Sequence, residues 1–369
     1  MKDDFNRNIA IVVALLLGLV ALDRLPHVAG HARGTGRLTF VINEMHNSEL
    51  NPDDSVTRAN GYYEGIQHTV RLAPGVENED YRLRDDFMRY EFKPNLKRRY
   101  EAGMRITNSL GMPNREYDYE KPPHTRRIAL VGDSVSVGPY GLDYPALLED
   151  RLNQTQLRPE IQTFQLLNFA VPGYILGQKM EVALEKVPKF HPDVYLVQLS
   201  MLEVGGTANH ISRLVVSGLD LKYDFLKRTA AQAGVQSDDP RSVVRFKLAP
   251  YFASLTRWSL ENIRDHAAAQ GAGMVILLIN PVVDAGLTAT YFNQLHEVTD
   301  TIGVPVIDLR DTFKGANFPS LQVIPGADPH PNVRGHEMLF EDLYTKFRAQ
   351  PDAWAALTGN AGKSSRLTF

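Results

Sequence analysis

The chain has 369 residues, of which 43% are hydrophobic and 22% are charged, and its formal net charge is −3. This composition is typical of a globular protein, and without a basic block nucleic acid is not expected as a partner. The chain has no cysteine, which excludes disulfides, thiolate metal sites and a cysteine nucleophile.

An uninterrupted apolar run covers residues 9–22, after Lys2 and Arg7. The run is shorter than the roughly 20 residues that span a bilayer, but it suits the core of a signal peptide. We therefore expect residues 1–30 to be a signal peptide or a membrane anchor, with retention favoured over cleavage. The rest of the chain would then lie in the cell envelope, anchored in the inner membrane and facing the periplasm, or be secreted after cleavage.

Residues 31–125 are polar and aromatic, and we predict an N-terminal extension that packs on the main domain. Short strands are expected at residues 37–43 and 87–92, because apolar and polar residues alternate loosely there. Two prolines after Lys121 then interrupt the chain before the next apolar run.

From Arg127 onward, short apolar runs alternate with segments of helical periodicity. The predicted strands are residues 128–131, 164–170, 194–199, 274–279 and 304–309, and the predicted helices are residues 144–152, 178–186, 260–270, 291–301 and 333–347. This alternation predicts an α/β domain over residues 126–350, with a parallel sheet covered on both faces. Active sites of such sheets lie at the carboxyl ends of the strands.

Two segments of this region have no predicted role in the sheet. The connection over residues 204–254 is long enough to carry a lid, a specificity element or extra helices. Residues 351–369 are predicted to be a polar tail without regular structure.

Three residues at predicted strand ends could form a nucleophilic site. Ser134 lies on a turn between Gly132 and Gly138, directly after the first apolar strand, and we expect it near the N-terminus of the next helix. Asp328 and His330 share one loop before the last helix. A serine hydroxyl needs a base to take its proton, and the base needs an acid to orient it.

Other chemistry is not indicated. The sequence has no HExxH motif, P-loop or glycine-rich dinucleotide fingerprint, so we expect no metal and no cofactor. His336, in the helix after His330, is interpreted as a structural residue.

These motifs resemble those of the SGNH/GDSL hydrolase family, in its membrane-linked bacterial form. The resemblance is carried by Gly-Asp-Ser at residues 132–134, Asn-Phe-Ala-Val-Pro-Gly-Tyr at residues 168–174 and His-Pro-Asn at residues 330–332. The lead-in over residues 107–123 is similar to that of membrane-linked members. The resemblance covers roughly residues 100–348.

The resemblance implies a flavodoxin-like three-layer α/β/α fold and serine esterase or acyl-transfer chemistry. By motif, Ser134 would be the nucleophile, His330 the base and Asp328 the residue that orients it. The backbone N–H groups of Ser134 and Gly173 would form the oxyanion hole.

The sequence departs from the family pattern at two places. The acid stands two residues before the histidine instead of three, with Ala327 at the usual position. Leu202 occupies the position of an asparagine that donates to the oxyanion, and leucine cannot donate. Asn209 or Ser200 would have to substitute, or the enzyme would be slow, specialised or inactive.

The sequence thus predicts a serine esterase that acts on an acyl ester, such as an O-acetyl group of a carbohydrate, through an acyl-serine. A polysaccharide O-acyltransferase uses the same chemistry and stays open as an alternative. A catalytically weak or inactive protein that binds or assembles carbohydrate is the third reading, and Leu202 favours it.

Overall fold

A computed structural model describes residues 80–100, 103–155 and 159–359. The predicted signal or anchor segment and the strand expected at residues 37–43 lie outside these residues. Within them, no helix is both long enough and apolar enough to cross a membrane.

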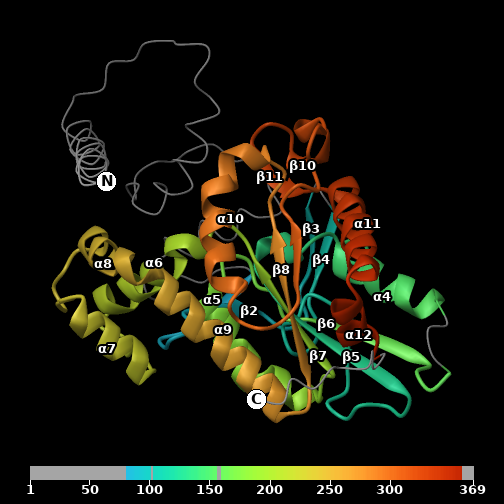
Figure 1. Ribbon diagram of the computed structural model, residues 1–369, viewed down its shortest axis with the longest axis horizontal. Helices are drawn as coiled ribbons and strands as arrows, with labels where there is room; N and C mark the ends of the chain where they lie inside the picture. The colour runs from blue at the N-terminus through green and yellow to red at the C-terminus, as the bar shows by residue number, and fades with distance from the viewer. Residues whose placement is uncertain (1–79, 101–102, 156–158, 360–369) are drawn as a thin grey trace. The chain divides into compact units, whose positions relative to one another are not determined.

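A five-stranded parallel sheet is the centre of the fold (Figure 1). Its strand order is β6-β5-β7-β8-β9, which is the flavodoxin-like order 2-1-3-4-5. The strands are β5 (Thr125–Val131), β6 (Thr163–Asn168), β7 (Val194–Leu199), β8 (Gly273–Ile279) and β9 (Val306–Leu309). Almost every residue of β7 and β8 is buried, as expected for strands with both faces covered. The predicted parallel α/β sheet is therefore confirmed.

Helices cover both faces of this sheet. One face packs against α5 (Leu176–Glu185), α6 (Glu203–Val216), α9 (Phe252–Ala269) and α10 (Ala285–Thr299). The other face packs against α4 (Tyr144–Gln154), α11 (Val333–Ala349) and α12 (Pro351–Thr358).

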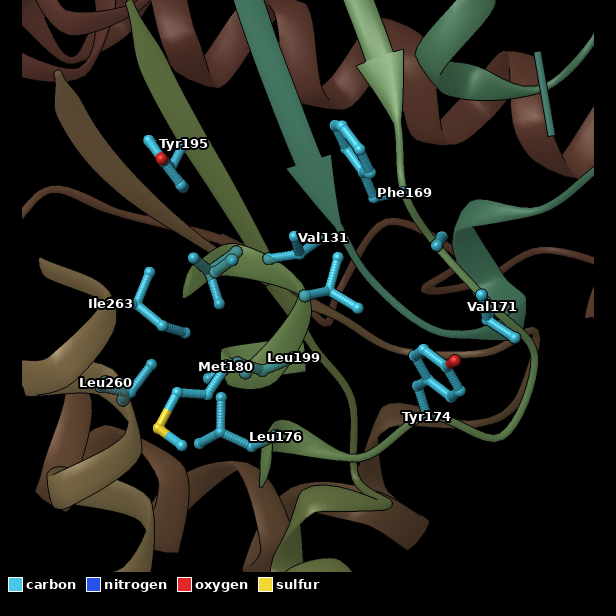
Figure 2. Packing of buried hydrophobic residues seen from close by; sticks show 14 of the residues in the cluster. Val131, Phe169, Val171, Tyr174, Leu176, Met180, Tyr195, Leu199, Leu260 and Ile263 are labelled. Atoms are coloured by element: carbon cyan, nitrogen blue, oxygen red, sulfur yellow. The ribbon is translucent and has the colours of Figure 1, made fainter. Parts of the chain in front are cut away.

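Alternation along the central strands assigns side chains to the two cores. In β5, Ala129 and Val131 point to the first core, and Ile128 and Leu130 to the second. Figure 2 shows the first core, where Met180 of α5 approaches Leu260 of α9 beneath the strands.

Three helices begin earlier than the sequence predicted, and the smallest difference is at α5, which begins at Leu176 rather than residue 178. The start of α10 is Ala285 rather than residue 291, because Asp284 caps it by accepting a hydrogen bond from the Gly286 N–H at 2.8 Å. The start of α9 is Phe252 rather than residue 260. Proline 305 precedes β9, which begins at Val306 instead of residue 304.

The long connection after β7 contains extra helices, one of the three possibilities that its length allowed. After α6 come α7 (Asp224–Gln232) and α8 (Arg241–Leu248), and α6 packs directly against α8. The backbone of α6 leaves helical geometry at Val204 and Gly205, so its first turn is offset from the rest.

The described part of the N-terminal extension consists of two hairpins. These pair β1 (Tyr81–Leu83) with β2 (Tyr90–Phe92), and β3 (Lys97–Tyr100) with β4 (Gly103–Ile106). The strand predicted at residues 87–92 starts only at Tyr90, because residues 84–89 form the turn that the Arg84 N–H closes onto the Arg89 carbonyl at 2.8 Å. Tyr81 and Phe87 are buried in the first core, so the described part of the extension packs on the main domain.

The prediction that the tail lacks regular structure is wrong for residues 351–358, which form α12. Pro351 suits the first helical position, and Ala353 and Leu357 are buried in the second core. The Arg126 guanidinium donates to the carbonyls of Ala356 and Leu357, at 2.5 Å and 2.8 Å, and so ties the helix to β5. Five residues of α12 are Ala, Trp or Leu, and it is the stretch after residue 358 that makes the tail polar as a whole.

Short elements complete the fold. They are the 3-10 turns η1 (Ser134–Ser136), η2 (Val187–Phe190), η3 (Ala249–Tyr251) and η4 (Phe318–Leu321), and the hairpin of β10 (Gln322–Ile324) with β11 (Asp328–Pro331).

Candidate active site

The turn after β5 holds Ser134. Asp133 caps the single turn η1, since its carboxylate accepts a hydrogen bond from the Val135 N–H at 3.0 Å. The next α-helix begins only at Tyr144. The expectation that Ser134 would lie at the N-terminus of a helix is therefore wrong for an α-helix, and any N–H donation at this turn comes from local backbone rather than from a helix dipole.

Gly132 is required by the close approach of other atoms to this turn. A Cβ atom there would lie 2.8 Å from Gln198 Oε1 and 2.8 Å from Ser136 Oγ. The Gln198 side chain uses this space to accept a hydrogen bond from the Asp133 N–H at 2.8 Å. The end of β7 thus fixes the backbone that carries Ser134.

The second half of the site comes from β11, almost two hundred residues later. His330 Nε2 lies 2.7 Å from Ser134 Oγ, and His330 Nδ1 lies 2.5 Å from Asp328 Oδ1. The same carboxylate oxygen accepts the His330 backbone N–H at 3.0 Å. Side chains two residues apart on a strand share one face, so the short spacing of acid and histidine still allows this contact.

The charge state of Asp328 suits an acid that stays ionised. Burial acts to raise the pKa of the Asp328 carboxyl, but the charge of His330 and hydrogen bonds from its ring and backbone outweigh burial and lower that pKa. The Asp328 and His330 side chains are only 16% and 14% exposed. Asp328 and His330 are therefore shielded from water, and the His330 ring still contacts Ser134 in the turn after β5.

The loop after β6 lies beside the turn that carries Ser134. The Val171 N–H donates to the Gly132 carbonyl at 3.3 Å, and Asn168 Nδ2 donates to the Ser136 carbonyl at 2.7 Å. Gly173 has a φ of +76°, which favours glycine over residues with a side chain. The structure thus brings the segment of Gly173 to the turn of Ser134.

The end of β7 offers no side-chain donor at position 202. Leu202 is 37% exposed at the start of α6. The Ser200 hydroxyl donates to Asp133 Oδ2 at 2.9 Å, and Asn209 Oδ1 accepts from Arg241 at 3.0 Å. Ser200 is therefore already committed to the buried carboxylate, and Asn209 lies farther along α6.

A buried cluster of charged side chains contacts the turn that carries Ser134. The Lys179 ammonium contacts the carboxylates of Asp133 at 3.0 Å and of Glu203, and it donates to the Gln198 carbonyl at 2.8 Å. The second Glu203 oxygen accepts the Leu176 N–H at 2.6 Å. We refer to Asp133, Lys179 and Glu203 as the buried triad.

The sequence did not predict the buried triad. Burial alone would raise the pKa of Asp133, but Lys179 and several hydrogen bonds lower it, whereas burial dominates at Glu203 and raises its pKa. A lysine and a glutamate at helix positions look like surface residues in a sequence. The apolar residues around Lys179, which is followed directly by Met180, are the only signal that it faces the core.

His336 is buried in α11, where its Nδ1 accepts the Tyr144 N–H at 3.4 Å. Burial lowers the pKa of His336 to about 3, with a further contribution from His330. A neutral, buried imidazole agrees with a structural role. Among the residues that the structure describes, no group of three or more His, Asp or Glu side chains is arranged to hold a metal ion.

No protein-family model matches this chain, and no curated protein matches it. Three of the solved structures with a similar backbone are a catalytic mutant of the acetylxylan esterase Axe2 from Geobacillus stearothermophilus, TesA, and LAE5, an alpha/beta hydrolase from the metagenome of Lake Arreo. Their sequence identities to this chain are 13%, 13% and 16%, and their TM-scores are 0.40, 0.37 and 0.40.

The aligned regions cover 60%, 61% and 60% of this chain and 93%, 99% and 94% of those proteins. Similarity at this level does not assign an activity to the chain.

Proposed function

We propose that this protein is a serine esterase that cleaves an acyl ester through an acyl-serine intermediate on Ser134. The observation that carries the proposal is the continuous chain of contacts from Ser134 Oγ through His330 to Asp328, at 2.7 Å and 2.5 Å. These are the distances that proton transfer from a nucleophile to an oriented base requires.

The proposed reaction has two halves. His330 Nε2 takes the Ser134 proton as Oγ attacks the ester carbonyl, and the resulting imidazolium is stabilised by the Asp328 carboxylate. The alcohol then leaves with that proton, and the acyl group stays on Ser134. In the second half, water loses a proton to His330 and attacks the acyl-serine, which releases the acid and restores the hydroxyl.

We assign the stabilisation of the oxyanion to the backbone N–H groups of Ser134 and Gly173. The hydrogen bond between Val171 and Gly132 supports this assignment, because it holds the two loops together. A third donor is not available from the Leu202 side chain, and loss of one donor typically costs about 10²–10³ in rate. Leu202 therefore favours a slow esterase as the second candidate.

The substrate we propose is an O-acyl ester of a carbohydrate, with acetyl as the acyl group. Its basis is the resemblance of residues 132–134 and 330–332 to the SGNH/GDSL family. Transfer of the acyl group to a sugar hydroxyl instead of water would use the same three residues. Acyl release that depends on an added carbohydrate acceptor would identify a transferase.

The location we propose is the cell envelope, because the apolar run at residues 9–22 suits an export signal or anchor. An alkaline phosphatase fusion after residue 40 should be active, since this reporter works only outside the cytoplasm. An inactive phosphatase fusion, with an active cytoplasmic reporter at the same site, would contradict export.

The nucleophile is tested by labelling with a fluorophosphonate, which reacts with activated serines. Wild type should be labelled, and Ser134→Ala should lose both labelling and esterase activity while keeping its circular dichroism spectrum. The matched control is Ser254→Ala, since Ser254 is an exposed serine in α9. Labelling of Ser134→Ala at the wild-type level would contradict the assignment.

A further inference from the structure

Arg213 of α6 carries a positive charge that no described carboxylate balances. Its Nε atom is buried and has no hydrogen-bond partner, and no described Asp or Glu forms an ion pair with its guanidinium. Arg213 is half-buried, and a charged group that is partly removed from water is costly when it has no partner. The residue therefore needs an explanation beyond the packing of α6.

Three further arginines lie close enough to repel Arg213. They are Arg89 in the β1–β2 turn, and Arg241 and Arg245 of α8. Burial, followed by the charge of Arg241, lowers the pKa of Arg213 to about 10. Helices α6 and α8 thus bring guanidinium groups together with the β1–β2 turn.

The backbone of Arg89 is held in an uncommon conformation. Its φ is +68°, in the left-handed region that residues with a side chain rarely adopt. Two hydrogen bonds fix the turn, from the Arg84 N–H to the Arg89 carbonyl at 2.8 Å and from the Arg89 N–H to the Asp86 carbonyl at 3.1 Å. Such strain is concentrated at functional sites, where the surrounding structure holds it.

The arginines lie on the side of the proposed oxyanion hole. The Tyr90 hydroxyl donates to the Pro172 carbonyl at 2.8 Å, directly before Gly173. The same hydroxyl is within electrostatic reach of both Arg213 and Asp133. Tyr90, which follows Arg89 directly, therefore joins the β1–β2 hairpin to the loop that carries Gly173.

Neighbouring His210 adds no charge to this region. It is buried on α6, its ring stacks edge-on against Phe87 with centroids 4.9 Å apart, and burial together with Arg213 lowers its pKa to about 3. A neutral imidazole leaves the local positive charge in place.

We propose that Arg213 and Arg89 form a subsite for an anionic group, a carboxylate or a phosphate, carried by the alcohol part of the ester substrate. The inference rests on the proposed esterase function and adds the substrate class: an acidic rather than a neutral acyl ester. Guanidinium groups bind both anions through paired N–H donors. A bound anion would balance the charge of Arg213, whereas Arg89 is already within electrostatic reach of the Asp85 carboxylate.

The test uses pairs of acetate esters that differ only in charge. The alcohols are ω-hydroxyalkanoic acids with two to eight methylene groups, and each is compared with its neutral primary amide. Wild type should show a higher kcat/KM for the acid than for the amide at one or more chain lengths, by about tenfold or more. A series with a terminal phosphate in place of the carboxylate distinguishes the two anions.

Arg213→Gln should remove this preference and leave kcat/KM for the amides unchanged. Arg213→Lys should keep part of it, because the charge remains but the paired donors do not. The matched control is Arg228→Gln, an exposed arginine of α7 in the same insertion, which should keep the full preference. Equal rates for acids and amides in wild type, or an unchanged preference in Arg213→Gln, would overturn the subsite.

Failure of the subsite is distinguishable from failure of the esterase. If neither the acids nor the amides are cleaved, the proposed function fails, and calorimetric titration with hexanoate and with inorganic phosphate at fixed ionic strength decides the subsite alone. Saturable binding to wild type that is lost in Arg213→Gln supports it. Absence of binding, or equal binding to both proteins, overturns it.

Discussion

At the scale of single residues, Leu202 sets the sharpest limit on the rate that this site can reach. It stands directly before α6, three residues after the end of β7, where an asparagine would add a third donor to the proposed oxyanion hole, and its side chain is 37% exposed. An amide at this position would be hydrated in the absence of substrate, so it would not be buried without partners.

We expect Leu202→Asn to raise the turnover of a small activated ester by up to about 10²-fold. The comparison is Leu202→Ala, which removes the same side chain without adding a donor and should not accelerate the reaction. Steady-state kinetics on both variants measure the difference. An unchanged rate in Leu202→Asn would mean that two backbone donors suffice.

We expect the stability of the folded protein to depend on pH because of Asp143, which caps α4. It accepts the Ala146 N–H at 3.0 Å, and burial raises its pKa to about 7, although hydrogen bonds from Ala146 and Gly138 act to lower it. Between its ordinary pKa of 3.8 and about 7, the folded protein holds a proton that the unfolded chain has lost. Stability therefore falls as pH rises through this window and levels off above it.

Asp143→Asn should flatten that part of the profile, because asparagine keeps the cap and does not titrate. At pH 8 the variant should be more stable than wild type by on the order of 2–4 kcal/mol. Urea unfolding at several pH values measures the effect, with Asp150→Asn, exposed in the same helix, as the control. A profile for Asp143→Asn that parallels wild type would show that Asp143 does not hold the proton.

At the scale of elements, the buried triad joins three pieces of the fold beneath the nucleophile. Asp133 belongs to the turn after β5, Lys179 to α5 and Glu203 to the start of α6. The Lys179 ammonium contacts both carboxylates, which would otherwise repel each other in a site that excludes water. The triad is therefore more important for positioning the turn than for net stability.

Replacing Lys179 with Met should destabilise the protein by about 3–5 kcal/mol, because it leaves buried carboxylates without a cation. It should also lower kcat, since Asp133 caps the turn of Ser134. Lys189→Met, at an exposed lysine of η2, should stay within about 0.5 kcal/mol of wild type. Adding Glu203→Gln to Lys179→Met should recover part of the loss, and a Lys179→Met variant as stable as the control would contradict the role.

Some residues of the candidate site could be predicted from the sequence, and the buried residues beneath them could not. Ser134, Asp328 and His330 could be predicted because their residue types occur at strand ends with family-like neighbours, and the structure brings them into contact. Lys179 and Glu203 could not, because their burial depends on the packing of α5 and α6, which local sequence does not encode. The turn at Ser134 was expected to enter a helix, but α4 begins only ten positions after Ser134, at Tyr144.

At the scale of the whole molecule, all five strands of the sheet were predictable, but α12, one of the helices that cover it, was not. Continuous apolar runs such as β8 indicate a strand covered on both faces, and the structure confirms it. Short helices with only one buried face have a weaker sequence pattern than such strands. The helix α12 was missed because it is short and is followed by a polar stretch, although five of its residues are Ala, Trp or Leu.

Removal of residues 351–369 should therefore destabilise the fold. It exposes the part of the second core that Leu357 covers, and it removes the acceptors of Arg126, with an expected loss of about 2–4 kcal/mol. Removal of residues 360–369 alone is the control, and it leaves α12 intact. Thermal unfolding should show a lower Tm only for the longer truncation, and equal Tm values would mean that α12 contributes little.

The central claim is a covalent acyl group on Ser134. Rapid acid quench of the enzyme with a small acetyl ester, followed by peptide mass spectrometry, measures it directly. We predict one acetyl group on the peptide that contains Ser134, present during turnover and absent in Ser134→Ala. Turnover of the ester by wild type with no acetyl group on Ser134 at any quench time, or with the acetyl group on another residue, would contradict the account.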